Sequence, residues 1–305
     1  MKKIFLVTLN YNTAEETHQW LSSMRKLIVP NYDLQFIIID NASKEPFSLV
    51  KNEQGENIHV IRSEVNTGFA GGNNIGMQYA LNHGADYILC INNDTFAEKK
   101  LLQELVAVLE NEPKVGVVTP KIYFAKGHEF HIDRYKKEDL GKVFWYAGGY
   151  TDWANVRSVH RGVDEVDQGQ YDKQEKIQFA SGCCMLFKRE VLEKIGLFDE
   201  RYFLYFEDAD LNERVKKKGY DITYIPKAVL WHMNAASSGG SGNLLQDYFL
   251  TRNRLLFGMT YAPLRTKIAL VRESFSLLLT GRPMQKKGIR DFLLGKFGKG
   301  TYFDK

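Results

Sequence analysis

The sequence predicts an α/β protein whose core is a mostly parallel, doubly wound sheet. In the first 120 residues, short apolar runs typical of buried strands alternate with stretches of helical periodicity. Polar or glycine-rich segments follow four of those runs, and the carboxyl ends of parallel strands meet at one edge of such a sheet. The chain has 305 residues, of which 44% are hydrophobic, so it can bury the core of one large domain or of two smaller ones.

Five strands are expected in this first part, with helices between them. The strands correspond, in order, to the runs KIFLVTL, LQFIIID, IHVIRS, DYILCIN and VGVVTP. The first helix is expected from about Ala14 to Leu27, and the second over NIGMQYALNHG, which ends at Gly84. A third is predicted over residues 99–111, because the apolar residues there fall on one helical face.

The alternation is lost over residues 125–177, which are rich in glycine, tyrosine, tryptophan and charge. We interpret this part as a β-rich or irregular insert that determines specificity. Order returns with a strand and short helix in FASGCCMLFKREVLEKIG, a helix in YFEDADLNERVKKKGY, and two strands, DITYI and AVLWH. From Leu244 onward the pattern predicts helices.

Charge is distributed unevenly along the chain. Residues 251–305 contain twelve Lys/Arg and three Asp/Glu, a net charge of +9, whereas the first 250 residues carry −5. A basic tail beside an acidic body indicates an anionic partner for the tail. Its arginines are interspersed with aliphatic and aromatic residues at helical spacing, so the tail can lie on an anionic membrane surface, or pack on the rest of the protein or on a dimer partner. No nucleic-acid recognition motif is present, so we expect no nucleic-acid partner.

The sequence also indicates the cellular compartment in which the protein is expected. The sequence contains neither a secretory signal nor an apolar run of the roughly 18 residues that cross a bilayer, so we expect a cytoplasmic protein. Three cysteines, two of them adjacent in an apolar run, predict no disulfide framework and no zinc site.

Residues 66–81, NTGFAGGNNIGMQYAL, hold four glycines and three asparagines just ahead of a helical pattern. The spacing differs from the G-x-G-x-x-G of dinucleotide sites, and no lysine completes a P-loop. Two interpretations remain: a tight strand-to-helix turn in which glycine takes a positive φ, and a loop whose backbone approaches a ligand. The convergence of four polar strand ends on one edge favours the ligand loop.

Three short motifs carry candidate chemistry. In INNDT, Asp94 follows a strand and can hold a divalent cation that bridges phosphates, or can form an Asx turn. In FEDADL, Glu207, Asp208 and Asp210 crowd the first turn of a helix, where acids complement the helix dipole or supply a general base. In LWHMN, His232 ends an apolar strand and is either a structural residue or a metal or phosphate contact.

The chain resembles the family 2 inverting glycosyltransferases, and most of all the bacterial rhamnosyltransferases, in six motifs taken in order and spacing: VTLNYN, IIIDNAS, NTGFAGGNNIGMQYAL, INNDT, SGCCMLFKREVLEKIGLFDERYFLYFEDADLNERVKKKGY and AVLWH. The resemblance covers about residues 3–300 and implies a GT-A fold, a Rossmann-like, mostly parallel sheet with a C-terminal helical extension. The implied organisation is a catalytic domain over residues 1–240 and a basic amphipathic helical extension over 241–305. The catalytic domain would have a nucleotide-sugar half, about 1–120, and an acceptor half, about 121–240.

By this resemblance, the nucleotide-sugar donor contacts residues at the strand ends and in the glycine stretch: Thr8, Asn10, Asp40, Asn66, Gly68, Gly71, Asn92 and Asn93. Asp94 is the expected ligand of Mg²⁺ or Mn²⁺, and His232 a further metal contact. Asn92 stands where the family's DXD-like motif has its first acid, a departure that leaves weaker metal binding open. Asp208 corresponds to the catalytic base, with Glu207 beside it.

The implied reaction is the inverting transfer of L-rhamnose from dTDP-L-rhamnose onto a growing, polyprenyl-linked polysaccharide of the bacterial cell surface. Two alternatives stay open: a UDP-hexose donor in the same fold, and a non-catalytic protein that binds nucleotide sugars. A nucleotidyltransferase is disfavoured, because the residues after the first strand do not form its phosphate-binding loop. Peripheral contact with the inner face of the plasma membrane and a homodimer are both compatible with the basic tail.

Overall fold

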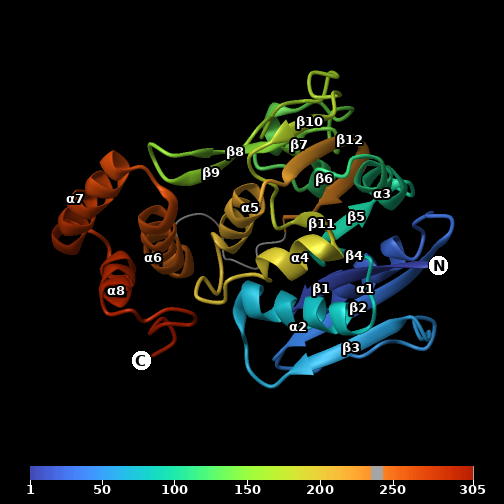
Figure 1. Cartoon of the computed structure of the whole chain (residues 1–305), viewed down its shortest axis with the longest axis horizontal. Coiled ribbons are helices and arrows are strands. Elements are labelled where there is room, and N and C mark those ends of the chain that lie inside the picture. The colour runs from blue at the N-terminus through green and yellow to red at the C-terminus, as the bar shows by residue number, and fades with distance from the viewer. Residues whose placement is uncertain (235–242, 305) are drawn as a thin grey trace.

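The computed structural model describes residues 1–234 and 243–304, which form a central sheet with helices packed against it (Figure 1). The ten strands of that sheet are β1 (Lys2–Asn10), β2 (Tyr32–Asn41), β3 (Ile58–Ser63), β4 (Tyr87–Ile91), β5 (Thr95–Ala97), β6 (Val115–Phe124), β7 (Phe144–Tyr146), β10 (Glu175–Ile177), β11 (Cys184–Lys188) and β12 (Asp221–His232). Two further strands, β8 (Gly149–Asp152) and β9 (Arg157–His160), make a separate hairpin.

The parallel strands of the sheet form two groups, one on each side of β11. The order is β10-β12-β6-β11-β4-β1-β2-β3, with β5 beside β12 and β7 beside β6. Strands β3, β2, β1 and β4 are parallel to one another, as are β6 and β12, whereas β11 is antiparallel to both β4 and β6. The predicted mostly parallel α/β sheet is confirmed. The apolar runs of β1, β2 and β4 are buried at their centres, as expected of strands covered on both faces.

Helices connect the strands and cover the sheet. They are α1 (Ala14–Met24), α2 (Gly68–Asn82), α3 (Leu101–Asn111), α4 (Arg189–Ile195), α5 (Glu207–Lys217), α6 (Leu244–Tyr261), α7 (Leu264–Thr280) and α8 (Pro283–Leu293), with one 3-10 turn, η1 (Ile132–Arg134). α2 packs on β1, β2 and β4, α3 on β6 and β12, and α5 on β12. In Figure 1, α6, α7 and α8 gather at one end of the molecule, away from β1, β2 and β3.

Helix α2 begins earlier than the sequence predicted. The glycine stretch was expected to be a loop, but α2 starts at Gly68, so the later glycines are helical and the loop prediction is wrong. A Cβ at Gly72 would overlap Leu9, and a Cβ at Gly76 would overlap Val7. Both contacts are with β1, so these glycines let α2 lie close to the sheet. The group that approaches their backbone is the protein itself.

Other elements differ from the prediction at their ends. DITYI and AVLWH form one strand, β12, whose register shifts between Ile225 and Val229. Pro226 lies in that stretch and removes a hydrogen-bond donor without ending the strand. α1 ends at Met24 rather than near Leu27. The short strand β5 was not predicted, because its pairing with β12 defines it rather than its own three residues.

The insert over residues 125–177 contains short strands and loops, as predicted. Its β8–β9 hairpin reaches the C-terminal helices (Figure 1). There, Trp153 stacks on Phe257 of α6 with ring centroids 5.5 Å apart. Arg254 of α6 donates a hydrogen bond to the carbonyl of Asn155 at 2.8 Å. The insert and α6 therefore pack together. The helices predicted for the tail are confirmed.

The structure also bears on two features considered from the composition, namely membrane-spanning helices and the environment of the cysteines. In residues 1–234 and 243–304, no helix is both long and apolar enough to cross a bilayer. Cys90, Cys183 and Cys184 are buried free thiols in or beside strands β4 and β11, as their apolar surroundings predict.

Candidate active site

Polar side chains from three strand ends form one hydrogen-bond network at an edge of the sheet. Parallel pairing sets Asn10 of β1 opposite Asp40 of β2. The Asn10 amide donates to Asp40 at 3.3 Å and to the Ser43 hydroxyl at 3.0 Å, and its carbonyl oxygen accepts from Thr17 of α1 at 3.0 Å. The amide of Asn93, just after β4, donates to the same Thr17 hydroxyl at 2.8 Å. The network thus connects β1, β2 and β4 at the edge predicted to hold a ligand.

The carboxylate of Asp40 is buried and extensively hydrogen-bonded. Burial alone would raise its pKa, but hydrogen bonds from Ser43, the backbone N–H of Phe47 and the guanidinium of Arg62 hold that pKa below its ordinary value of 3.8. Arg62 comes from β3, where the sheet register pairs it with Asp40. Asp40 is therefore an anion that joins three strands, and Arg62 is a partner that sequence reasoning did not identify.

Thr8 and Asn10 are enclosed by protein. Both residues are fully buried, and no residue in the described part of the chain hydrogen-bonds to the hydroxyl of Thr8. Their direct contact with a nucleoside stays a prediction.

A tight turn before α2 is held by Asn41, the last residue of β2. Its side-chain amide donates to the Asn66 side chain and to the carbonyl of Gly68, both at 3.1 Å, and its oxygen accepts from the N–H of Thr67 at 3.0 Å. The Asn66 side chain also accepts from the N–H of Gly68 at 2.8 Å. Gly71 lies in the first turns of α2, where an added Cβ would come within 2.7 Å of the Thr67 Cβ. Asn66 and Gly68 are thus positioned by Asn41, which the sequence analysis did not single out.

Asp94 and His232 are brought together by the pairing of β5 with β12. In this register His232 lies opposite Thr95, and the N–H of Met233 donates to the Asp94 carbonyl at 2.9 Å. The Nε2 atom of His232 lies 3.1 Å from Oδ1 of Asp94, and both side chains are largely buried. The two residues predicted as metal ligands are therefore in contact.

An aromatic ring from the insert packs against His232. The ring of Trp145 meets His232 edge-to-face with centroids 4.6 Å apart, and it meets the ring of His160 at the same separation. Burial lowers the pKa of His160 to about 4, so this imidazole is neutral at neutral pH. Sequence reasoning missed Trp145 and His160, because nothing in the irregular insert indicates which of its residues face the sheet edge.

The acidic motif FEDADL begins α5. Asp208 accepts hydrogen bonds from the N–H of Gly182 at 2.9 Å and from that of Ala209 at 2.8 Å. Burial raises the pKa of Asp208 above its ordinary value of 3.8, although these N–H groups oppose the rise. Glu207 is buried, and one of its carboxyl oxygens has no hydrogen-bond partner among the described residues. Its own burial and the neighbouring Asp208 raise the pKa of Glu207 well above 4.5, so Asp208 is the carboxyl group better suited to carry charge.

Asp208 lies close to the strand end that carries INNDT. Its hydrogen-bond partner Gly182 precedes Cys183, and the carbonyl of Cys183 accepts from the N–H of Asn92 at 3.0 Å. Antiparallel pairing of β11 with β4 brings these two segments together. The candidate base is therefore connected through Gly182 and Cys183 to the strand end that precedes Asp94, although these residues are far apart in the sequence.

The loop before α5 has a strained backbone. Phe203, Tyr205 and Phe206 have positive φ angles of 64°, 68° and 72°, a region that bulky residues rarely adopt. The loop also contacts the start of α2, where the N–H of Ala70 donates to the Phe203 carbonyl at 3.2 Å. A Cβ at Gly68 would overlap Phe203, so only glycine fits at that contact.

Helix α6 fixes this loop through two fully buried side chains. The amide of Asn253 donates to three loop carbonyls, those of Tyr202, Leu204 and Tyr205, at 2.8, 2.8 and 2.9 Å. Arg252 donates to the Tyr202 carbonyl at 3.1 Å. Of the placements left open for the tail, packing on the rest of the protein therefore holds for Arg252, a buried side chain that braces the loop leading to Asp208.

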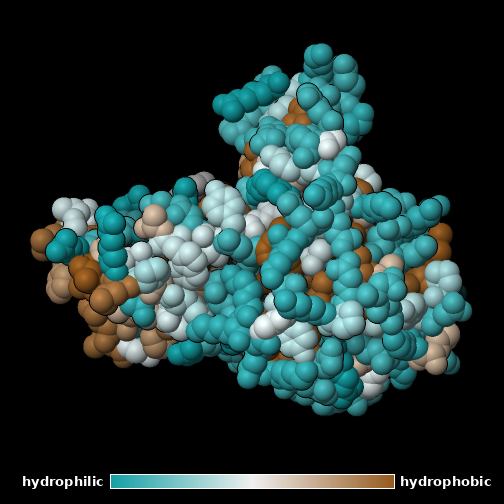
Figure 2. Space-filling view, turned by 45° about the horizontal axis from the view of Figure 1, so that its top comes forward, coloured by the Kyte–Doolittle hydropathy of each residue, from teal (hydrophilic) through white to brown (hydrophobic). Residues whose placement is uncertain are grey.

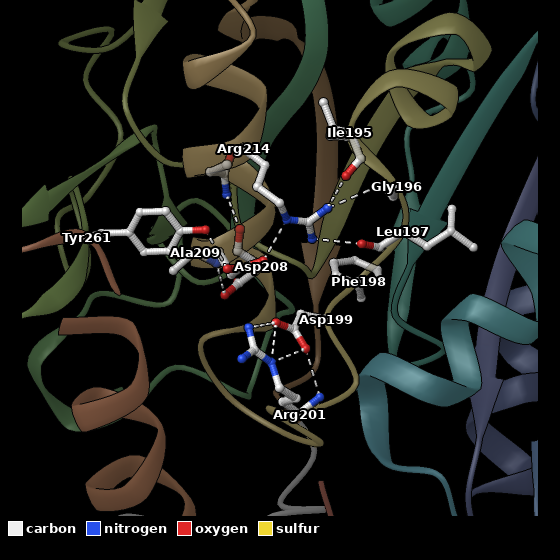
Figure 3. Close-up of polar contacts among 12 residues, drawn as sticks. Ile195, Gly196, Leu197, Phe198, Asp199, Arg201, Asp208, Ala209, Arg214 and Tyr261 are labelled. Carbon is white, nitrogen blue, oxygen red and sulfur yellow. Dashed lines mark hydrogen bonds and ion pairs between the residues drawn. The ribbon is translucent and has the colours of Figure 1, made fainter. Parts of the chain in front are cut away.

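Asp210, the third acid of the motif, is bound within the protein. Its carboxylate accepts from Arg214 and from the Tyr261 hydroxyl, both at 2.7 Å. The guanidinium of Arg214 also donates hydrogen bonds to the carbonyls of Ile195 at 2.6 Å and Leu197 at 2.7 Å (Figure 3). These contacts tie α5 to the end of α4 and to α6, so the role of Asp210 is structural.

Comparison with known proteins places this site in a family. The family model described as "Glycosyl transferase family 2" matches residues 5–196. The chain belongs to glycosyl transferase family 2. The matched residues include the polar ends of β1, β2 and β4 and all of α2, whereas α5 and β12 lie beyond them.

Curated relatives of the transferase cover most of the chain at low identity. The low-salt glycan biosynthesis hexosyltransferase Agl10 of Haloferax volcanii is 23% identical over 82% of this chain and 74% of its own length. The N-acetylglucosaminyl-diphospho-decaprenol L-rhamnosyltransferase of Mycobacterium tuberculosis is 22% identical over 77% of each chain. The dTDP-rhamnosyl transferase RfbF of Shigella flexneri is 24% identical over 75% of this chain and 68% of its own.

Solved structures confirm the GT-A fold. GalNAc-T7, solved with UDP, GalNAc and Mn²⁺, aligns with a TM-score of 0.65 at 15% identity, over 100% of this chain and 56% of its own. TarS 1-349 of S. aureus aligns with a TM-score of 0.56 at 15% identity, over 96% of this chain and 79% of its own. The GT-A architecture implied by the sequence resemblance is thus the fold of the transferase.

The residues of the transferase fit a divalent cation that takes only part of its ligands from protein. Asp94 and His232 offer a carboxylate and an imidazole in contact, and the buried Nδ1 of His232 has no hydrogen-bond partner within the described residues. No group of three or more His, Cys, Asp or Glu side chains forms a metal site in residues 1–234 and 243–304. A cation such as Mg²⁺, which binds one or two protein groups together with substrate phosphates, suits so small a set.

Proposed function

We propose that the transferase moves L-rhamnose from dTDP-L-rhamnose onto a saccharide carried by a polyprenyl diphosphate, with inversion at the anomeric carbon. The observation that carries the proposal is the position of Asp208. Its carboxylate is partly buried and accepts hydrogen bonds from the N–H groups of Gly182 and Ala209. It also lies beside the strand end that holds INNDT. A base on one side and a site for the leaving diphosphate on the other are what a single displacement needs.

In this reaction the acceptor hydroxyl gives its proton to Asp208 while its oxygen attacks the anomeric carbon. The bond from that carbon to the diphosphate oxygen breaks, and the nucleoside diphosphate leaves from the opposite face. The raised pKa of Asp208 makes it a stronger base than an exposed aspartate. Burial and the neighbouring Asp208 raise the pKa of Glu207 well above its ordinary value, so we assign the proton transfer to Asp208 rather than to Glu207.

We assign Asp94 and His232 as the protein ligands of Mg²⁺ or Mn²⁺. When bound, the cation would offset the negative charge that develops on the departing diphosphate. The presence of Mn²⁺ in the GalNAc-T7 structure supports a divalent cation. Asn92, with no charge to contribute, leaves Asp94 as the acid of INNDT that can bind the metal.

The names of the relatives support the donor and acceptor. The Shigella flexneri protein is named a dTDP-rhamnosyl transferase, and the name of the Mycobacterium tuberculosis protein specifies a diphospho-decaprenol acceptor. Such an acceptor would place the reaction at the cytoplasmic face of the membrane that holds the polyprenyl lipid. A UDP-hexose is the second candidate donor, supported by the structure of TarS with UDP-GlcNAc and by the hexosyltransferase name of Agl10.

Calorimetric titration tests the donor. The purified protein is titrated with dTDP-L-rhamnose, UDP-galactose, UDP-N-acetylglucosamine and GDP-mannose, each with Mn²⁺ and with a chelator. We expect dTDP-L-rhamnose to bind most tightly and to need Mn²⁺, and we expect Asp94→Asn to remove the effect of Mn²⁺. Asp133→Asn, in the exposed turn η1, is the matched control and should leave the titration unchanged. Preference for another sugar would overturn the rhamnose assignment, and failure of all four to bind would overturn the proposal that this protein uses a nucleotide-sugar donor.

A further inference from the structure

Helix α7 carries a continuous apolar row on its outer face. The row consists of five residues at spacings of three and four, which share one side of a helix: Leu264, Ile268, Val271, Phe275 and Leu279. All five are exposed, from 42% for Val271 to 80% for Leu279. Leu270, on the side that packs toward α6 and α8, is the buried residue of the helix. Figure 2 shows hydrophobic side chains gathered at the end of the molecule that the C-terminal helices form.

A contiguous apolar row of this kind differs from scattered surface hydrophobics. Single exposed leucines are normal on soluble proteins, whereas contiguous apolar patches mark interaction surfaces. All five side chains are exposed to solvent, so packing within the described chain leaves this row uncovered.

Basic side chains border the apolar row. Arg265 and Arg272 are seven residues apart, so they lie on the same side of it, and with Leu264, Ile268 and Ala269 they line an open groove. The helix thus presents guanidinium groups next to aliphatic side chains, which is the arrangement of helices that lie at a lipid–water boundary.

The acidic residues of these helices are occupied within the protein. Asp247 pairs with Arg282, Glu273 pairs with Arg254, and Asp291 is buried. The cations of α7 and α8 have no ion-pair partner among the residues that the structure describes; they are Arg265, Lys267, Arg272, Lys286, Lys287 and Arg290. This end of the molecule therefore presents positive charge that no acid on the same helices offsets.

We propose that the outer face of α7 docks on an anionic membrane surface, with its apolar row among the acyl chains and its flanking cations at the lipid phosphates. A second copy of the chain fits less well, because two such faces would bring like charges together. A nucleic acid would supply phosphates but no apolar phase for the row. The inference needs no assumption about the sugar that is transferred.

Docking through α7 would also place the active site near the lipid. α7 packs on α6, and Asn253 of α6 holds the loop that leads to Asp208. An acceptor anchored in the same membrane would then be delivered to the base without leaving the bilayer. This consequence alone rests on the proposed acceptor.

Co-sedimentation with vesicles tests the docking. The full chain is mixed at low salt with vesicles of phosphatidylcholine alone, or of equal parts phosphatidylcholine and phosphatidylglycerol. We expect binding to the anionic vesicles that weakens as salt is added. Phe275→Glu with Leu279→Glu, and separately Arg265→Gln with Arg272→Gln, should each lower the ratio of bound to free protein by roughly tenfold or more.

The matched control replaces two exposed hydrophobic residues outside the C-terminal helices. Ile28→Glu with Val50→Glu removes two side chains that are also exposed, 48% each, and adds the same charge, so this variant should bind as the unchanged protein does. The proposal is overturned if the unchanged protein stays in the supernatant with anionic vesicles, or if the control loses as much binding as the α7 variant. It is also overturned if sedimentation equilibrium finds a dimer that Phe275→Glu with Leu279→Glu dissociates, because a second copy then covers the face. Donor titration of each variant keeps this outcome separate from that of the proposed function.

Discussion

Adjacent carboxyl groups at the start of α5 have different environments, and this difference gives them different roles. Two backbone N–H groups donate hydrogen bonds to Asp208, while burial and the proximity of Asp208 raise the pKa of Glu207 well above its ordinary value. A buried acid that ionises poorly couples the stability of the fold to pH. Because folding raises the pKa of Glu207, its contribution to stability is fully present below its ordinary pKa of 4.5 and is lost as pH rises through the raised value.

Glu207→Gln should therefore flatten the pH dependence of stability. The amide cannot ionise, so the free energy of unfolding of the variant should fall less than that of the unchanged protein as pH rises above about 4.5. Urea denaturation at a series of pH values measures this difference. Glu190→Gln removes an exposed acid from α4 and serves as the control, with the decrease expected to remain in place. A decrease as steep in Glu207→Gln as in the unchanged protein would contradict the assigned environment.

For individual residues, the sequence predicts which ones come together in the site, but it does not predict the contacts that each side chain makes. Asp94 and His232 were both predicted as metal ligands, and they are in contact. Asn41 lies next to Asp40 in the motif DNAS, so its position was available, but its four hydrogen bonds depend on a turn far along the chain. The burial of Thr8 could not be predicted, because a polar residue in a strand looks the same whether it faces a ligand or a helix.

Helix α2 shows how glycines can act inside a regular element. Replacing a helical glycine by alanine ordinarily stabilises a helix by about 1 kcal/mol. At Gly76, however, the new Cβ would overlap Val7 of β1, and overpacking of this kind costs about 1–3 kcal/mol. We expect Gly76→Ala to destabilise the protein, as measured by urea denaturation.

A double-mutant cycle separates the overlap from other causes. Val7→Ala removes the atom that the new Cβ would meet, so Gly76→Ala should cost clearly less in that background. Equal costs in both backgrounds would show that close packing of α2 on β1 is not the reason for this glycine.

The loop before α5 depends on α6 in a way that a second variant can test. Asn253→Ala removes the donor of three loop carbonyls and should lower the free energy of unfolding by about 1–3 kcal/mol. It should also reduce turnover, because the loop positions Asp208. Asn57→Ala, whose amide bonds to a single carbonyl of Leu34, is the matched control and should leave turnover unchanged. If Asn253→Ala keeps full turnover, α6 has no part in positioning the base.

Elements with strong periodicity were predictable, and elements defined by their neighbours were not. The long apolar runs of β1 and β2 and the amphipathic α3 appear where the sequence places them. The start of α2 was missed because glycine and asparagine ordinarily signal turns, while tertiary packing here keeps them helical. Strand β5 exists only through its contact with β12, and that same contact sets Asp94 beside His232.

At the scale of the whole molecule, the site is assembled from two parts of the chain. The matched family residues 5–196 supply the strand ends and Asp94, while Asp208, His232 and Asn253 come from the remainder. Strand β11 joins the two parts, since it lies antiparallel between β4 and β6. The sequence predicted parallel strands but not the position of this one, because strand order is a property of the assembled sheet. We propose that the chain divides into a catalytic domain over 1–240 and a helical extension over 241–305. In this division the extension holds the loop that leads to Asp208 and docks on the membrane.

The measurement that tests the account most directly is the turnover of Asp208→Asn with the preferred donor and an acceptor. The amide keeps the size of the side chain and its bond to Gly182 but cannot take a proton, so turnover should fall by about 10²–10⁴ while donor binding persists. In the unchanged protein, the raised pKa of Asp208 should place the acid limb of kcat/KM above that of an ordinary aspartate, and this limb should be absent from the residual activity of the variant. Unchanged turnover in Asp208→Asn, with the same acid limb, would contradict the assignment of this residue as the base.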